Sequence, residues 1–185
     1  MMRIFEKVYN ANHTFYRGYP EKYTFDDSHP IFLSDTDKYA IVYAKMLKES
    51  TDVDLDQEGF IYEIKIKTDL SIFDANDKND LNKLLSKIDL TTSQINILKN
   101  KDWLYLHDGV NREQIEDTLK ELDYDGYKNN EFVSGLILGS ENAYEAKGSG
   151  YCIFDPSKLS ITEIYDADDY MAEKNIFFED CVSFI

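Results

Sequence analysis

The stretch IFLSDTDKYAIVYA, residues 31–44, joins a short apolar run to a longer amphipathic one and indicates a strand followed directly by a helix. Ile31–Ser34 has the composition of a strand. Asp35 and Thr36 then offer side-chain oxygens that can cap a helix. The apolar stripe behind them, made of Tyr39, Ile41, Val42, Ala44 and Met46, predicts a helix over about residues 36–49.

Segments typical of strands lie on both sides of this unit. In residues 60–66, FIYEIKI, isoleucine alternates with glutamate and lysine, which predicts a strand with one face in water. Other segments with strand composition are residues 13–19, 133–138, 151–154 and 161–165, and the final run 176–185 could pair with a strand or pack against the core.

Residues 75–122 have a different pattern, in which leucine and isoleucine recur at helical spacing. Three helices fit, and the last should begin at Arg112, because Asn111 and Gln114 have the spacing of a capping box. We therefore expect an α+β fold in a single domain over residues 1–185, with a helical insert at about 75–122.

Length and charge exclude several classes of protein. A chain of 185 residues with 43% hydrophobic residues can bury one core, so it should fold rather than be disordered. Its 36 acidic and 20 basic side chains give a formal charge of -16. Such a charge repels phosphate, so we expect neither direct nucleic-acid binding nor binding to an anionic membrane.

The remaining composition predicts a cytoplasmic protein without a metal. The N-terminus lacks the apolar stretch of a signal peptide, and no run approaches the ~18 apolar residues of a membrane span. Cys152 and Cys181 do not indicate a disulfide framework. The histidines, His13, His29 and His107, show no metal-ligand spacing.

Three places in the sequence could carry chemistry, and each also has a structural explanation. Arg17 precedes Gly18 at the end of an aromatic strand, where its guanidinium could bind a diphosphate or a ribose hydroxyl, or simply lie at the surface. Ser34 could orient a carboxylate in a cleft or cap the following helix. The third place is a Gly, Ser and Asn-rich segment before residue 151 that contains Glu131, Glu141 and Glu145; most glutamates in such loops are merely solvated.

Read in order, four motifs resemble the ADP-ribosyltransferase superfamily, and in particular small bacterial and phage-encoded relatives of its toxin and poly(ADP-ribose) polymerase domains. The motifs are FYRG at residues 15–18, IFLSDTDKYAIVYA at 31–44, YDGY at 124–127 and YCIFDPSKL at 151–159. The resemblance leaves the helical insert outside.

This resemblance implies a split pair of antiparallel sheets that grips NAD in the cleft between them. Arg17 matches the first-strand arginine that holds NAD, and Ser34 matches the serine that orients the catalytic glutamate. Phe32 and Tyr43 match aromatic residues near the nicotinamide, and Tyr16 and Gly18 complete the expected NAD-binding set.

One position departs from the family pattern. Where many relatives have the catalytic glutamate, directly before the strand at 151–154, this chain has Gly150. The reaction needs a carboxylate, because positive charge develops on the ribose as nicotinamide leaves. Glu145, five residues upstream, is the expected substitute, ahead of Glu141 and Glu131.

The resemblance implies a mono-ADP-ribosyltransferase that uses NAD as substrate and modifies a macromolecule, such as a host protein if the gene belongs to a phage or a toxin system. The acidic charge favours a basic protein partner. Two alternatives do not require catalysis: an acidic decoy for nucleic acid that blocks a basic partner, and a degenerate transferase fold retained for binding.

Overall fold

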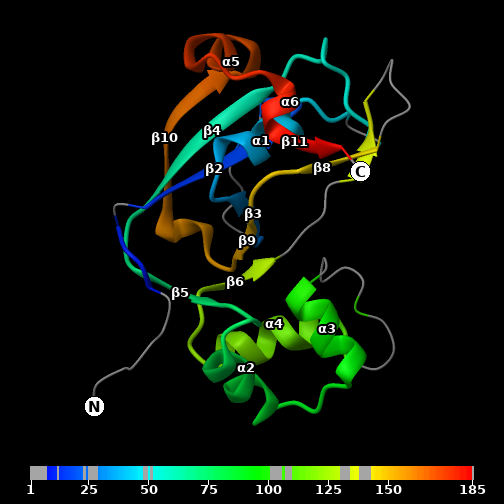
Figure 1. The fold of residues 1–185 in the computed structure, drawn as a ribbon. Coiled ribbons are helices and arrows are strands. Elements are labelled where there is room, and N and C mark those ends of the chain that lie inside the picture. The colour runs from blue at the N-terminus through cyan, green and yellow to red at the C-terminus, as the bar shows by residue number, and fades with distance from the viewer. Residues whose placement is uncertain are drawn as a thin grey trace.

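The computed structural model describes residues 8–11, 13–22, 24, 29–47, 50, 52–100, 106, 110–129, 134–137 and 143–184. It is a mixed α+β structure with a large, mostly antiparallel open sheet (Figure 1). The strands are β1 (Val8–Tyr9), β2 (Thr14–Tyr19), β3 (Ile31–Ser34), β4 (Phe60–Ile66), β5 (Leu70–Phe73), β6 (Gly126–Asn129), β7 (Ser134–Leu136), β8 (Ala143–Ala146), β9 (Gly150–Ile153), β10 (Leu159–Asp166) and β11 (Val182–Phe184). The α-helices are α1 (Asp37–Ala44), α2 (Lys78–Leu85), α3 (Thr92–Asn100), α4 (Arg112–Glu121), α5 (Ala167–Lys174) and α6 (Phe178–Cys181).

The large sheet has eight strands in the order β1-β5-β6-β9-β3-β2-β4-β10, and only the β5–β6 pair is parallel. A separate three-stranded sheet has the order β11-β8-β7. The large sheet is one continuous layer, but its strands are not equally joined. β2 pairs with β4 over six residues and β3 pairs with β9 over four, whereas β2 and β3 share one pair, Tyr16 with Ser34. The number of paired residues between neighbouring strands is therefore smallest between β2 and β3.

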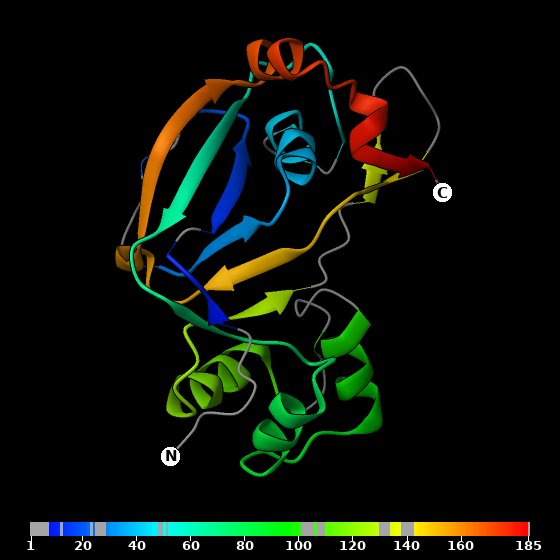
Figure 2. The same ribbon diagram turned by 60° about the vertical axis from the view of Figure 1, so that its left-hand side comes forward.

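Helices cover one face of the large sheet in two places. We call this the α1 face; it carries Tyr16, Gly18, Ser34 and Ile61, because cross-strand partners point to the same side. α1 packs here over β2 and β4. The insert packs farther along the same face, where Phe32, Cys152 and Tyr127 form a cross-strand row with its leucines and isoleucines. Figure 2 shows α1 beside β2 and β3, and α2 to α4 beside β5 and β6.

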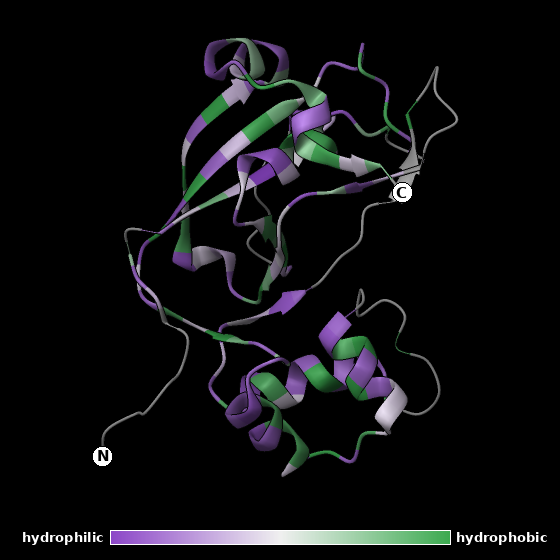
Figure 3. Cartoon of the chain, viewed as in Figure 1, coloured by the Kyte–Doolittle hydropathy of each residue, from purple (hydrophilic) through white to green (hydrophobic). Residues whose placement is uncertain are grey.

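On its opposite face the large sheet curves, so that its own strands enclose a second core. This core contains Phe15, Leu33, Tyr62, Ile64 and Tyr151 with other apolar residues of the same strands. Alternation along β4 sends Tyr62, Ile64 and Ile66 to this side and Ile61 to the α1 face. Figure 3 shows the resulting bands of apolar and polar residues along β4 and β10.

Most of the predicted elements are confirmed. Ile31–Ser34 and Phe60–Ile66 have the expected bounds, and the insert has three helices, the last starting at Arg112 with the expected Asn111–Gln114 capping box. The helix expected over residues 36–49 ends early, at Ala44, because Met46 forms a bridge to Val53 instead of another helical turn.

Several expectations need correction or fall outside the described residues. Gly126 and Tyr127 of the YDGY motif belong to β6, Glu145 lies on β8 and not in a loop, and the final run 176–185 holds α6 and β11. The ends of the expected strand 133–138 lie outside the described residues, as do Glu131, Glu141 and His107. Among the residues that the structure describes, no helix is long and apolar enough to cross a membrane.

Candidate functional site

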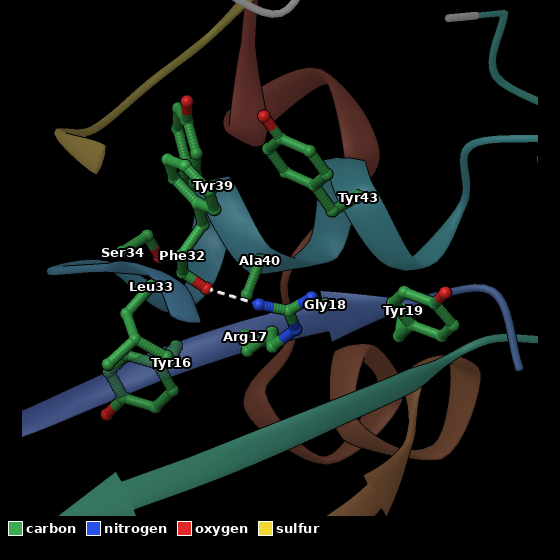
Figure 4. Close-up of a pocket in the computed structure, with 10 residues that line it drawn as sticks. All are labelled: Tyr16, Arg17, Gly18, Tyr19, Phe32, Leu33, Ser34, Tyr39, Ala40 and Tyr43. Atoms are coloured by element: carbon green, nitrogen blue, oxygen red, sulfur yellow. Dashed lines mark hydrogen bonds between the residues drawn. The ribbon is translucent and has the colours of Figure 1, made fainter. Parts of the chain in front are cut away.

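A cavity of about 220 Å³ lies over β2 and β3, where the sheet has the fewest paired residues, and α1 forms its wall (Figure 4). Its lining consists of Tyr16, Arg17, Gly18, Tyr19, Phe32, Leu33, Ser34, Tyr39, Ala40 and Tyr43. All six residues that the sequence analysis assigned to NAD binding belong to this lining. The structure thus brings together residues from three separate segments of the chain.

Arg17 bridges the two strands where they no longer pair. Its Nη1 donates a hydrogen bond of 2.8 Å to the carbonyl of Phe32, two residues before the paired Ser34 (Figure 4). The guanidinium also lies 5.7 Å from the centre of the Tyr19 ring. Because this contact holds the guanidinium beside the cavity, a fixed cation is available there for an anion.

Gly18 is required by packing. A Cβ at this position would lie 1.7 Å from the Ala40 carbonyl oxygen, so α1 can cross β2 only over a glycine. From the sequence, Gly18 is expected to belong to the NAD-binding set. The structure shows that the backbone of α1 approaches there, and that Gly18 lines the cavity as a consequence.

Ser34 is almost fully buried, with 2% of its surface exposed, and its hydroxyl donates a hydrogen bond of 2.5 Å to the Thr36 carbonyl. The cap of α1 is Thr36, whose Oγ1 accepts from the Tyr39 amide. The residue that caps α1 is therefore Thr36 and not Ser34. Ser34 lies in the wall of the cavity.

Asp35 is a well-connected carboxylate that the sequence analysis treated only as a possible cap. Its Oδ1 accepts from the Ser149 amide at 2.9 Å and its Oδ2 accepts from the Tyr151 hydroxyl at 3.2 Å. Burial raises the pKa of the Tyr151 phenol, to which the hydrogen bonds with Tyr9 and Asp35 contribute. Asp35 therefore ties the start of β9 to the end of β3.

The strand register aligns polar side chains in a row on the α1 face. From the sheet edge inward, the directly paired residues are Glu163, Glu63, Tyr16, Ser34, Gly150 and Asn129. Directly paired side chains in such a ladder have Cβ atoms about 4.5–5.5 Å apart. The row brings Glu63 beside Tyr16 and Tyr16 beside Ser34, whereas Gly150 brings no side chain to the other flank of Ser34.

Tyr16 links the cavity to nearby carboxylates. Burial raises the pKa of its phenol, and the negative charges of Asp37 and Glu63 raise it further. Asp37 accepts a hydrogen bond of 3.0 Å from the Tyr170 hydroxyl, and Glu63 accepts one of 3.4 Å from Thr162. The phenol consequently stays protonated and can donate a hydrogen bond at neutral pH.

Glu145 is not brought to the cavity. It lies on β8, paired with Ser134 and Ser183 in the small sheet. Its neighbours Tyr144 and Ala146 point into the core that α1 and α6 share, so alternation directs Glu145 to the other face of that sheet. The structure therefore unites the expected Arg17 and Ser34 but leaves the expected Glu145 apart.

Other cavity residues were not identified from the sequence as ligand contacts. Tyr39 was assigned to the apolar stripe of α1, and its ring lies 5.3 Å from that of Tyr43. Their spacing of four residues is the signal that could have found it, because residues i and i+4 share a helix face. Glu63 does not line the cavity but pairs with Tyr16, which does, and this position could not be found from the sequence because it depends on strand register.

Among the described residues, no group of three or more His, Cys, Asp or Glu side chains could hold a metal ion. No protein-family model, no characterised protein and no solved structure matches this chain.

Proposed function

We propose that this protein is a mono-ADP-ribosyltransferase that cleaves NAD and transfers ADP-ribose to a macromolecule, most naturally a basic protein. The single observation that carries the proposal is the shared cavity of Arg17, Ser34, Tyr16, Phe32 and Tyr43. Its combination of one guanidinium with aromatic walls suits a ligand that has both a phosphate and a flat ring.

The size of the cavity limits which part of NAD would enter. At about 220 Å³ it is smaller than the roughly 300–1,000 Å³ of sites that enclose a whole small ligand. The nicotinamide and its ribose would occupy the cavity between Tyr39, Tyr43 and Ser34. The diphosphate would lie at the Arg17 side, where the guanidinium fork can donate two parallel hydrogen bonds.

The reaction breaks the bond between the ribose anomeric carbon and the nicotinamide nitrogen, and nicotinamide leaves with the electron pair. A nucleophile of the acceptor forms the new bond to that carbon and loses a proton. The developing positive charge on the ribose needs a nearby carboxylate. The sequence suggests Glu145 as this carboxylate, but the row of paired polar residues on the α1 face favours Glu63, which lies beside Tyr16.

The experiment is to measure nicotinamide release from NAD, and transfer of labelled ADP-ribose to proteins of a cell lysate. We expect release by the wild type, and NAD binding weakened about tenfold in Arg17→Lys, because a lysine cannot donate the bidentate pair. Of the variants Glu63→Gln and Glu145→Gln, the one that loses turnover while still binding NAD identifies the carboxylate. A wild type that releases no nicotinamide refutes the enzymatic proposal.

A second candidate function is supported by Gly150. Ser34 has no carboxylate from β9 beside it, so the same cavity could bind NAD or a partner without turnover. In that case calorimetry would detect NAD binding while nicotinamide release stays at the buffer level. A nucleic-acid decoy, which rests on the charge of -16 alone, would bind its partner in a complex that weakens steeply with salt.

A further inference from the structure

β10 is an edge strand of the large sheet. It pairs with β4 on one side, and no described strand pairs with it on the other. Figures 1 and 2 both place β10 at the outer margin of the sheet. An edge strand presents a row of backbone N–H and C=O groups that can pair with an added strand.

A β-bulge gives this edge an apolar side. Ile161 pairs with Ile64 and Glu163 with Glu63, so Thr162 is an extra residue that shifts the alternation. As a result Ile161 and Ile164 both lie opposite residues of the enclosed core. They are nevertheless 37% and 51% exposed, so the rim of that core is incompletely covered at the edge.

The other side of the same edge is acidic. Glu163 is exposed on the α1 face; Asp166, which caps α5, pairs with Phe60 and therefore lies on the same side as Ile164. Residues 160–175 carry five carboxylates, namely Glu163, Asp166, Asp168, Asp169 and Glu173, against Lys174, and only Asp168 of these pairs with a lysine from elsewhere in the described residues, Lys45. The one lysine of β4, Lys65, lies toward the other end, where it pairs with Ser160. Negative charge thus gathers at the C-terminal half of β10.

We propose that the edge of β10 over residues 161–166 binds an extended segment of a partner protein in which apolar and basic residues alternate. Strand alternation would place the apolar side chains against Ile161 and Ile164 and the basic ones beside Glu163. A second copy of this chain is a poorer occupant, because two acidic edges would face each other in chains that each carry a charge of -16.

The proposal does not depend on NAD cleavage, and its test uses the whole chain. The probe is a capped synthetic peptide of alternating isoleucine and lysine with threonine at both ends; the comparison peptide has glutamate in place of lysine. We expect the lysine peptide to bind and to slow amide hydrogen exchange within residues 159–166. Glu163→Lys should weaken that binding about fivefold and should improve binding of the glutamate peptide.

Glu179→Lys is the matched control, since Glu179 is exposed on α6 and the substitution changes the net charge equally. It should leave the lysine peptide's affinity within about twofold of the wild type. Equal weakening by Glu163→Lys and Glu179→Lys would mean that only net charge attracts the peptide, and would overturn the proposal. The proposal would also be overturned if the peptide slowed amide hydrogen exchange only outside β10. The same holds if the amides of β10 already exchanged slowly without the peptide, either in the free protein or in a dimer.

Discussion

Gly18 illustrates, at the scale of a single residue, how backbone packing shapes the cavity. We expect Gly18→Ala to lower the free energy of unfolding by about 3 kcal/mol or more, because the methyl group would meet the Ala40 carbonyl of α1, which cannot move without shifting the helix. Chemical denaturation of the variant measures this. Ser183→Ala, at an exposed position on β11, should change stability by less than about 0.5 kcal/mol; equal losses in both variants would contradict the explanation.

The two cysteines permit a second prediction at this scale. Cys152 and Cys181 are both fully buried, and burial raises the pKa of each thiol to about 12. Because the thiolate is the reactive form, neither should react with an aromatic disulfide reagent at pH 8 in the folded protein. Both should react once the protein is unfolded. Rapid labelling of the native protein would mean that one of the two segments opens readily.

At the scale of elements, Lys45 holds three segments together. Its buried Nζ donates to the carbonyls of Leu55 and Gln57 and to Asp168 Oδ1, at 3.1, 2.8 and 2.7 Å. These contacts connect the end of α1 to the loop before β4 and to the start of α5. The lysine that ends α1 therefore also fixes how α5 packs against the sheet.

Replacing Lys45 tests this connection. Lys45→Met keeps the apolar stem but leaves the carbonyls of Leu55 and Gln57 without the donor from the buried Lys45, so we expect a loss of about 2–3 kcal/mol in the free energy of unfolding. Asp168→Asn should cost less than about 1 kcal/mol, since that side chain is 63% exposed and the solvent screens it. Thermal denaturation followed by circular dichroism compares the two; a larger loss in Asp168→Asn would show that the ion pair, not the carbonyls, matters.

At the scale of the whole molecule, buried phenols and thiols predict an alkaline limit to stability. Burial raises the pKa of Tyr144 to about 12, as it does for both cysteines, and it raises the pKa of Tyr16 and Tyr151 as well. In the unfolded chain these groups lose their protons near pH 8.5–10. Above that range the unfolded state binds fewer protons than the folded one, so stability falls as pH rises.

We therefore expect the free energy of unfolding to depend little on these groups below about pH 8 and to decrease from about pH 9 to 12. Urea denaturation across this range measures the change. Tyr144→Phe removes one of the titrating groups and should make this decrease less steep. It keeps the ring that packs beside Phe178, and the variant and the wild type are compared at each pH. A stability that rises above pH 9 would contradict the burial of these groups.

The sequence by itself determined the local elements wherever short-range chemistry decides them. The period-two pattern of Phe60–Ile66 and the capping pair of Asn111 and Gln114 were sufficient, because side-chain alternation and helix caps involve neighbours in the chain. It also indicated Arg17, which directly precedes a glycine, and Ser34, which lies shortly before the start of a helix. β6 and β8 escaped it because their strand character comes from the partners beside them.

Only the tertiary structure decided which of those residues meet. Strand register joins Glu63, Tyr16, Ser34 and Gly150 across four strands that lie far apart in the sequence, and it leaves Glu145 in another sheet. The crossing of α1 over Gly18 and the early end of the helix at Ala44 are likewise long-range effects. Register and packing depend on contacts between distant segments, and these contacts have no local signature in the chain.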